Sequence, residues 1–158
     1  MPGKPKKSKP SKATPEATSA PGPGGPYRVA PAEIERLKTF LDERGFRLLE
    51  EIHEPNFFGD RWLRWSRHDV RVQVVLDRGR WFVDVPPAWA QEWSGYGLEI
   101  VIDAMDEVDH FTHLLPLPEA IAVLEDRIDE IAEFLSTDDG CAAVGEKRRE
   151  RAHKWFGA

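Results

Sequence analysis

The sequence predicts an α+β fold: an N-terminal helix, a four-stranded antiparallel meander and two C-terminal helices follow one another along the chain (α-β-β-β-β-α-α). Two observations lead to this expectation. Apolar residues recur every three or four positions in 31–45, 97–108 and 118–135, whereas they roughly alternate with polar residues between 46 and 85. Because the strands are consecutive and not interleaved with helices, we expect an antiparallel sheet with the helices packed on one of its faces.

The chain is expected to hold one folded domain. Its 158 residues suffice for one domain with a substantial core and are too few for two of ordinary size. Residues 1–26 contain seven prolines, four glycines and almost no large apolar side chain, so we expect a disordered Lys/Pro-rich tail there. The α+β domain is assigned to 27–136. The basic segment 137–158 is compatible with a frayed helix, in which Trp155 and Phe156 could dock on the domain.

The first two elements follow from local patterns. The stretch PAEIERLKTFLDERG (31–45) is typical of an amphipathic helix, with a proline in its first turn and Gly45 as its stop. Its inward residues are expected to be Ile34, Leu37, Phe40 and Leu41. The stretch FRLLEEIHE that follows alternates roughly by two, which predicts a strand with one apolar side. That side is expected to carry Phe46, Leu48 and Ile52.

The stretch RWLRWSRHDVRVQVVLDRGRWFVDV (61–85) supplies three further strands, whose register can be tested against itself. A loop at Asp77–Arg80 pairs Leu76 with Trp81, Val74 with Val83 and Val72 with Val85. A loop at Ser66–Asp69 pairs Trp65 with Val70 and Leu63 with Val72. Both loops place these side chains on the same face, so this face is expected to be buried, with Trp65 and Trp81 in the core.

The opposite face of the meander is a candidate contact surface. In the expected register Arg64 lies directly opposite Arg71, and two facing arginines repel each other unless an anionic or acidic partner relieves them. The candidate partner-binding residues on this face are Trp62, Arg64, Arg71, Gln73 and Phe82. The alternative is that the arginines lean into solvent and that Trp62 lies under a loop or under the C-terminal segment.

A second candidate surface is acidic. Residues 98–139 hold thirteen acidic side chains and one arginine, so their net charge is −12. On the last predicted helix Asp126, Asp129, Glu130 and Glu133 share one face at spacings of three and four. This stripe could hold a basic partner, although a solvated face is the common explanation for such a pattern.

Metal binding and catalysis have weaker signals. Asp106, His110 and His113 stand at i, i+4 and i+7 and would share one helix face, which suits zinc. The following LLPLP indicates that the helix is ending there, where histidine is favourable for its charge alone. We therefore expect no metal and no cofactor.

The sequence contains no glycine-rich phosphate loop, no nucleophile elbow, no HExxH pair and only one cysteine, Cys141, so a non-enzymatic protein is expected.

Composition limits the location and the partners. The sequence lacks an apolar run of membrane-spanning length and an apolar stretch behind its basic start, so we expect a cytoplasmic protein without a membrane partner. Residues 27–158 hold 17 basic and 27 acidic side chains, a net charge of −10. This charge disfavours nucleic acid as the partner, because duplex binding usually needs a contiguous basic face.

Three short stretches carry a resemblance to a known class of proteins. RGFR after the leading helix, DRGRWFVDV in the meander, and WAQEW after a proline break resemble small uncharacterised bacterial proteins of the toxin-immunity type. The likeness covers about residues 31–135 and concerns their pattern. It implies a non-enzymatic module that blocks a toxin by binding it. The alternative is a nucleic-acid-associated accessory protein that uses the basic tail and the arginine-rich hairpin.

Overall fold

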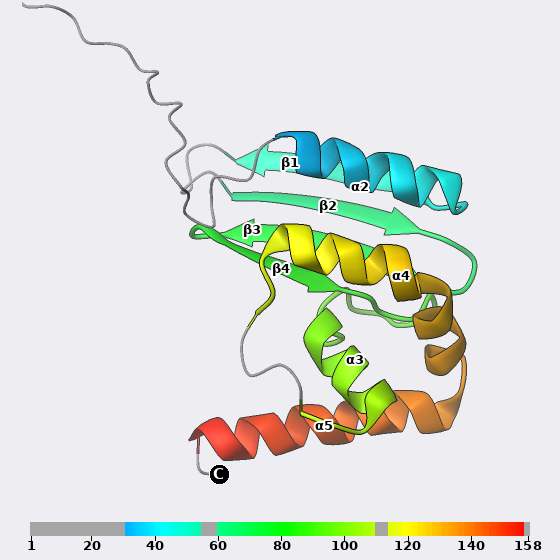
Figure 1. Cartoon of the computed structure of the whole chain (residues 1–158), viewed down its shortest axis with the longest axis vertical. Coiled ribbons are helices and arrows are strands. Elements are labelled where there is room, and N and C mark those ends of the chain that lie inside the picture. Colours follow the sequence, from blue (N-terminus) through cyan, green and yellow to red (C-terminus); the bar gives the residue numbers. More distant parts are fainter. Residues whose placement is uncertain (1–30, 55–59, 110–113, 157–158) are drawn as a thin grey trace, which may run out of the picture.

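The chain has the predicted α+β architecture (Figure 1). The structure is a computed structural model that describes residues 31–54, 60–109 and 114–156. Its four strands form one antiparallel sheet in the order β1-β2-β3-β4. The elements in chain order are α2 (Pro31–Glu43), β1 (Arg47–Glu54), β2 (Asp60–Ser66), β3 (Arg71–Asp77), β4 (Arg80–Asp84), α3 (Leu98–Asp106), α4 (Leu117–Leu135) and α5 (Asp138–Phe156). The expected tail 1–26 lies outside the described residues.

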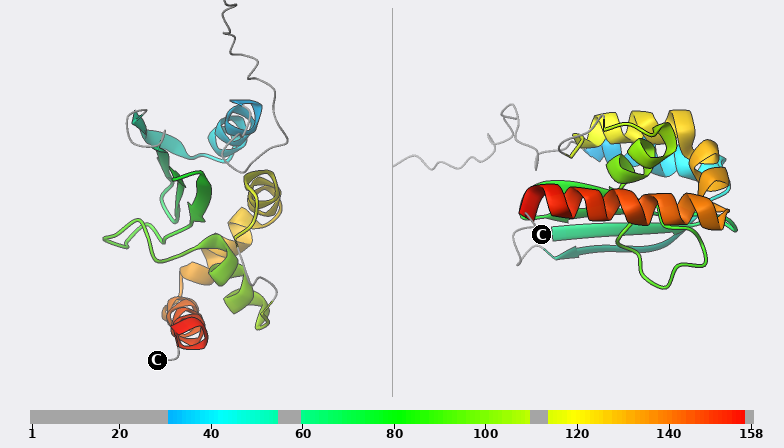
Figure 2. Two further views of the ribbon diagram at one scale, coloured as in Figure 1. Left: turned by 90° about the vertical axis from the view of Figure 1, so that its left-hand side faces the viewer. Right: turned by 90° about the horizontal axis from the view of Figure 1, so that it is seen from below.

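The helices divide into two groups around the sheet. Figure 2 shows α2 and α4 side by side over one face of the sheet, whereas the loop between β4 and α3 projects on the other side. Helices α3 and α5 pack against each other beyond β4. The basic C-terminal segment is thus helical from Asp138 onward, and α4 is the closing helix that covers the sheet.

The core lies between the sheet and the pair α2–α4. The inner faces of these helices contribute large side chains that are fully buried, among them Leu37, Leu41, Ile121, Leu124 and Ile128. Trp65 is 2% exposed and Trp81 is 7% exposed, which confirms their expected place in the core. Alternate strand residues point to the helices because side chains along a strand have a period of two.

The predicted register of β3 and β4 is confirmed, although the turn is tighter than expected. Leu76 pairs with Trp81 and Val74 with Val83. Asp77 and Arg80 also pair, so only Arg78 and Gly79 form the loop. Both loop residues have positive φ, 51° and 83°, which is the backbone conformation of the two-residue turn that matches the twist of a hairpin.

The predicted register of β2 and β3 is wrong by two residues. Trp65 pairs with Val72 and not with Val70, and Leu63 pairs with Val74. Arg67 accounts for the difference: its backbone N–H donates to the Val70 carbonyl at 2.9 Å, and its guanidinium donates to Asp69 and to the carbonyl of Arg44. A shift of two keeps every side chain on its face, so the buried face was predicted correctly despite the error.

The prediction that Phe46, Leu48 and Ile52 share one side of the first strand is also wrong. The register of β1 against β2 shifts between Leu48 and Glu50, where one extra residue forms a bulge. Leu48 therefore pairs with Trp65, on the helix-covered face, while Ile52 pairs with Trp62 on the other face. A single inserted residue reverses the alternation, and Leu48 and Ile52 do not share a side.

Candidate functional site

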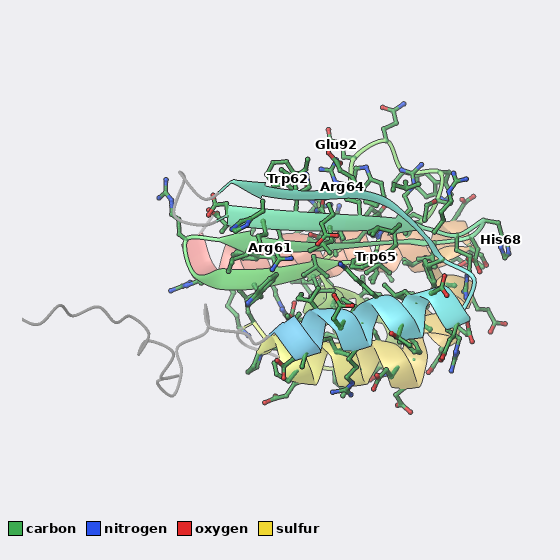
Figure 3. All side chains as sticks on the ribbon, turned by 90° about the horizontal axis from the view of Figure 1, so that it is seen from above. Arg61, Trp62, Arg64, Trp65, His68 and Glu92 are labelled. Atoms are coloured by element: carbon green, nitrogen blue, oxygen red, sulfur yellow. The ribbon has the colours of Figure 1, made fainter. Side chains whose placement is uncertain are left out.

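The face of the sheet that points away from α2 and α4, here called the outer face, carries a polar ladder. Figure 3 shows Trp62 and Arg64 on this side, toward the loop that holds Glu92, whereas Arg61 and Trp65 point to the helices. One residue from each strand forms the ladder: Glu50, Arg64, Gln73 and Asp84. Arg64 donates to Glu50 at 3.2 Å and to Gln73 at 2.7 Å, and Gln73 donates to Asp84 at 3.4 Å.

The loop between β4 and α3 fixes two arginines of the outer face. The guanidinium carbons of Arg64 and Arg71 lie 5.1 and 5.0 Å from the ring centre of Trp93, within cation–π distance. Arg71 also donates to the Ala90 carbonyl at 3.0 Å. The predicted pairing of Arg64 with Arg71 is wrong, since Arg64 faces Gln73 across the strands. The two arginines share an aromatic ring, and their charges do not need an external anion.

Beside the ladder lies a second cross-strand row, which is apolar and which we call the apolar row. Ile52, Trp62, Val75 and Phe82 follow one another across all four strands. Each of these side chains is half-buried. None of the helices in the described part of the chain lies over this face of the sheet (Figure 2). The row therefore leaves apolar surface at a place where a sheet is usually either covered or polar.

A pocket of about 880 Å³, the arginine pocket, opens at the β4 end of the apolar row. Its walls come from β4, the 95–97 loop, the first turn of α3 and the second half of α5. Its polar lining comprises Arg80, Asp84, Glu99, Arg148, Arg149 and Arg151, and its apolar lining includes Phe82, Ile100, Leu114 and Ala152. Phe82 thus belongs both to the apolar row and to the pocket.

Three of the pocket arginines have no carboxylate partner among the described residues: Arg80, Arg148 and Arg149. Elsewhere in these segments, exposed arginines do form such pairs, for example Arg36 with Glu125 and Arg44 with Asp129. The lack of pairing is therefore not a general property of this surface. The pocket gathers guanidinium groups whose donors remain available.

The two carboxylates of the pocket are bound by the protein itself. Glu99 is buried and accepts a hydrogen bond from the Leu115 N–H at 2.9 Å. Asp84 accepts from Gln73 and from backbone N–H groups of the 95–97 loop. Burial, reinforced by the nearby charge of Glu99, raises the pKa of Asp84 from 3.8 to about 6 despite these hydrogen bonds. Neither carboxylate forms an ion pair with a pocket arginine.

Ion pairs hold α5 in place as a wall of the pocket. Arg151 pairs with Asp103 of α3, whose side chain is fully buried. Lys147 pairs with Asp109 at 3.4 Å. Few apolar side chains of α5 are buried, and Val144 is the one within the core cluster. The position of this helix, and of Arg148 and Arg149 on it, thus depends strongly on charged contacts.

The predicted acidic stripe on α4 is exposed, and its residues have different partners. Asp129 pairs with Arg44 at 2.9 Å and with Arg67 at 3.0 Å. Glu130 pairs with Arg127, which also binds Asp106. No partner is found for Asp126 or Glu133 within the described segments. Half of the stripe is therefore neutralised by arginines of the same chain.

Of the three predicted metal candidates, the structure describes only Asp106, the last residue of α3. Helix α3 ends at Asp106, and Glu107 adopts a left-handed conformation that closes it. His110 and His113 lie outside the described residues, so their part of the prediction is not tested. In the segments that the structure describes, no three His, Cys, Asp or Glu side chains are grouped to hold a metal ion.

None of the helices in those segments combines the length and apolar character that a membrane span requires.

Comparisons with protein-family models, with curated proteins and with solved structures find no match to this chain. The site therefore has to be interpreted from its own geometry. It combines an apolar row, a ladder that holds the outer face rigid, and a pocket with available guanidinium donors.

Trp62 and Phe82 lie on the outer face, as the sequence predicts, whereas the sequence gives no indication of the arginine pocket. The basic run EKRRER stands out in the C-terminal segment, yet its spacing does not reveal that Arg148 and Arg149 line the same pocket as Arg80. Trp93 was also missed, because it lies in a loop without periodicity. A contact between residues far apart in the chain leaves no pattern in the local sequence. The face on which a strand residue lies, in contrast, follows from the alternation along its strand.

Proposed function

We propose that this chain is a non-enzymatic binding protein whose partner is another protein. The partner presents an acidic segment with an apolar side chain, which occupies the arginine pocket and the apolar row together. The observation that carries the proposal is the group of three unpaired arginines at the end of an uncovered apolar row. Interfaces are commonly anchored by aromatic residues and arginines that become desolvated together.

The charge of the site favours an acidic segment as the occupant. An acidic side chain in the pocket can accept charge-assisted hydrogen bonds from its arginines, and such bonds are stronger than neutral ones. The adjacent Trp62 and Phe82 can bury an apolar side chain of the same segment. Electrostatic complementarity of this kind mainly sets specificity and association rate, while the apolar contact supplies affinity.

A nucleic acid fits this surface less well. A long polyanion needs many cationic contacts, whereas the pocket offers three arginines that lack a carboxylate partner in the described segments. The net charge of −10 over residues 27–158 opposes it as well. The immunity-type partner expected from the resemblance stays a prediction, as a toxin with such an acidic segment would be one case of the proposed class.

The proposal can be tested with a fluorescein-labelled peptide of about fifteen residues that contains glutamates and a central phenylalanine. We expect binding by the full chain at 150 mM salt, weakened about tenfold or more by Trp62→Ala and by Arg80→Glu with Arg148→Glu, because anchor residues commonly contribute 2 kcal/mol or more. Arg47→Glu is the matched control, since Arg47 is exposed on β1, far along the sheet from the pocket. Preference for a single-stranded oligonucleotide over the peptide would overturn the proposal.

A further inference from the structure

We propose that the arginine pocket binds a phosphate monoester. The bound segment of the partner protein then carries a phosphorylated side chain, which occupies the pocket. This inference rests on the proposed function and names the group that the site selects. Three arginines from two elements line a pocket with an apolar wall, and none of them has a carboxylate partner in the segments that the structure describes.

The three guanidiniums approach the pocket from different directions. Arg80 comes from β4, while Arg148 and Arg149 are consecutive on α5 and are therefore separated by about 100° around the helix axis. The Arg148 guanidinium lies over the backbone of Gly95, 3.5 Å from where a Cβ atom would stand. An anion in the pocket would thus lie within reach of arginine side chains from both elements.

The number and arrangement of these donors fit a phosphate better than a carboxylate. A carboxylate has two coplanar oxygens and is well satisfied by one forked guanidinium. A phosphate monoester has three terminal oxygens directed to different sides and a charge of about −1.5 to −2 near neutral pH. Arginines from two different elements can donate to more than one oxygen of such a group.

The carboxylates of the pocket favour a single phosphate over several. Asp84 and Glu99 are bound by Gln73 and by the Leu115 N–H, and neither draws a pocket arginine toward it. They would repel a second phosphate placed deeper in the pocket. Such a pocket therefore selects a monoester against a diphosphate or a polynucleotide.

The apolar wall of the pocket would contact the organic group that carries the phosphate. A pocket of about 880 Å³ is far larger than a phosphate ion and has the size of sites that hold small organic ligands. Phe82, Ile100 and Leu114 line it beside the arginines. A phosphotyrosine-like group, with an aromatic ring behind its phosphate, uses both kinds of lining.

The test uses isothermal titration of the full chain with three peptides that differ at one central position: phosphotyrosine, tyrosine or glutamate. We expect the phosphotyrosine peptide to bind at least about tenfold more tightly than the other two, since three charge-assisted contacts are added. Phenyl phosphate should bind weakly at the same site, and benzoate should bind more weakly still.

Substitutions show where the peptide binds. They also separate the effect of the arginine charge from that of the forked guanidinium shape. Arg80→Gln, Arg148→Gln and Arg149→Gln should each reduce affinity for the phosphotyrosine peptide about tenfold, with Arg47→Gln unchanged as the control. Arg148→Lys should restore only part of the affinity, because lysine keeps the charge and loses the fork. Circular dichroism of each variant verifies that the fold is retained.

The outcomes distinguish this inference from the proposed function. Equal binding of the glutamate and phosphotyrosine peptides would overturn the phosphate inference and leave the acidic-segment function standing. Binding of phenyl phosphate without binding of any peptide would assign the site to a small phosphorylated molecule and overturn the protein partner. Absence of binding by all probes would overturn both.

Discussion

The two faces of the sheet are built from alternate residues of the same strands, yet they are stabilised in different ways. The inner face is mainly apolar: Leu63, Val72 and Val74 are completely buried under α2 and α4, and Arg61 and Glu51 form an ion pair on the same face. The outer face lies under none of the helices α2 to α5 that the structure describes; the polar ladder and two arginines that stack on Trp93 stabilise it. Burial fixes the first face and directional polar contacts fix the second.

The comparison separates residues that maintain the fold from residues that are available for binding. The apolar side chains of the inner face are packed under the helices, so their substitution is expected to be costly. On the outer face the ladder residues bind one another, whereas the apolar row is only half-buried and the three pocket arginines have no carboxylate partner among the described residues. A surface that is rigid but incompletely satisfied is what a preorganised binding site requires.

The largest expected difference between the faces is at two neighbouring valines. Val74→Asp should lower the free energy of unfolding by several kcal/mol, because it places a carboxylate on the fully buried side. Val75→Asp should cost much less, since Val75 lies on the outer face between Trp62 and Phe82. Urea denaturation of both variants measures the difference. Equal destabilisation would contradict the assignment of inner and outer faces.

The next effect concerns the charge at the end of the ladder and depends on pH. The pKa of Asp84 is about 6 in the folded chain, compared with its ordinary value of 3.8. The folded state therefore favours the protonated carboxyl group. The resulting stabilisation is fully present below about pH 4 and is lost as the pH rises through 6. Asp84→Asn removes this loss. The variant should equal the wild type near pH 4 and exceed it by about 3 kcal/mol near pH 8.

Urea denaturation of wild type and variant across this pH range tests the prediction. The difference between the two chains is the useful quantity, because other carboxylates titrate in both. A difference that does not change with pH would mean that Asp84 is not held in a site that disfavours its charge.

A smaller effect is expected for the aromatic ring that stabilises the outer face. Trp93→Ala should lower the free energy of unfolding by about 1–2 kcal/mol, because it removes two cation–π contacts and packing against Arg64 and Arg71. Trp89→Ala on the same loop is the control, since Trp89 is 64% exposed and should change stability by less than about 0.5 kcal/mol. Similar losses in both variants would indicate that the loop matters and the stacking does not.

The smallest effect on stability is expected in the pocket. Arg80→Gln and Arg148→Gln should each leave the free energy of unfolding within about 0.5 kcal/mol of the wild type, because neither arginine has a carboxylate partner in the described segments. A clear gain in stability would show that the guanidiniums repel one another in the free protein. A loss above about 1 kcal/mol would show that they maintain the fold, and would weaken their assignment to binding.

The sequence by itself determined the elements, their order and the face of each central strand that is buried. These features depend on periodicity, which is local: a period of two assigns Trp65 and Trp81 to one face, and a period near 3.6 assigns the buried side of α2 and α4. The exception on β1 has the same origin, because the inserted residue beside Leu48 that reverses the alternation has no sequence signature of its own.

Tertiary structure decided the rest. A two-residue shift between β2 and β3 keeps the same face buried, so alternation could not detect it; the contacts of Arg67 with Asp69 and Arg44 set the register and placed Arg64 opposite Gln73. The stacking of Trp93 on Arg64 and the pocket that Arg80 lines together with Arg148 and Arg149 involve residues far apart in sequence. Such contacts arise only when the packed helices and sheet bring distant segments together, which is why the candidate site was not visible in the pattern of the chain.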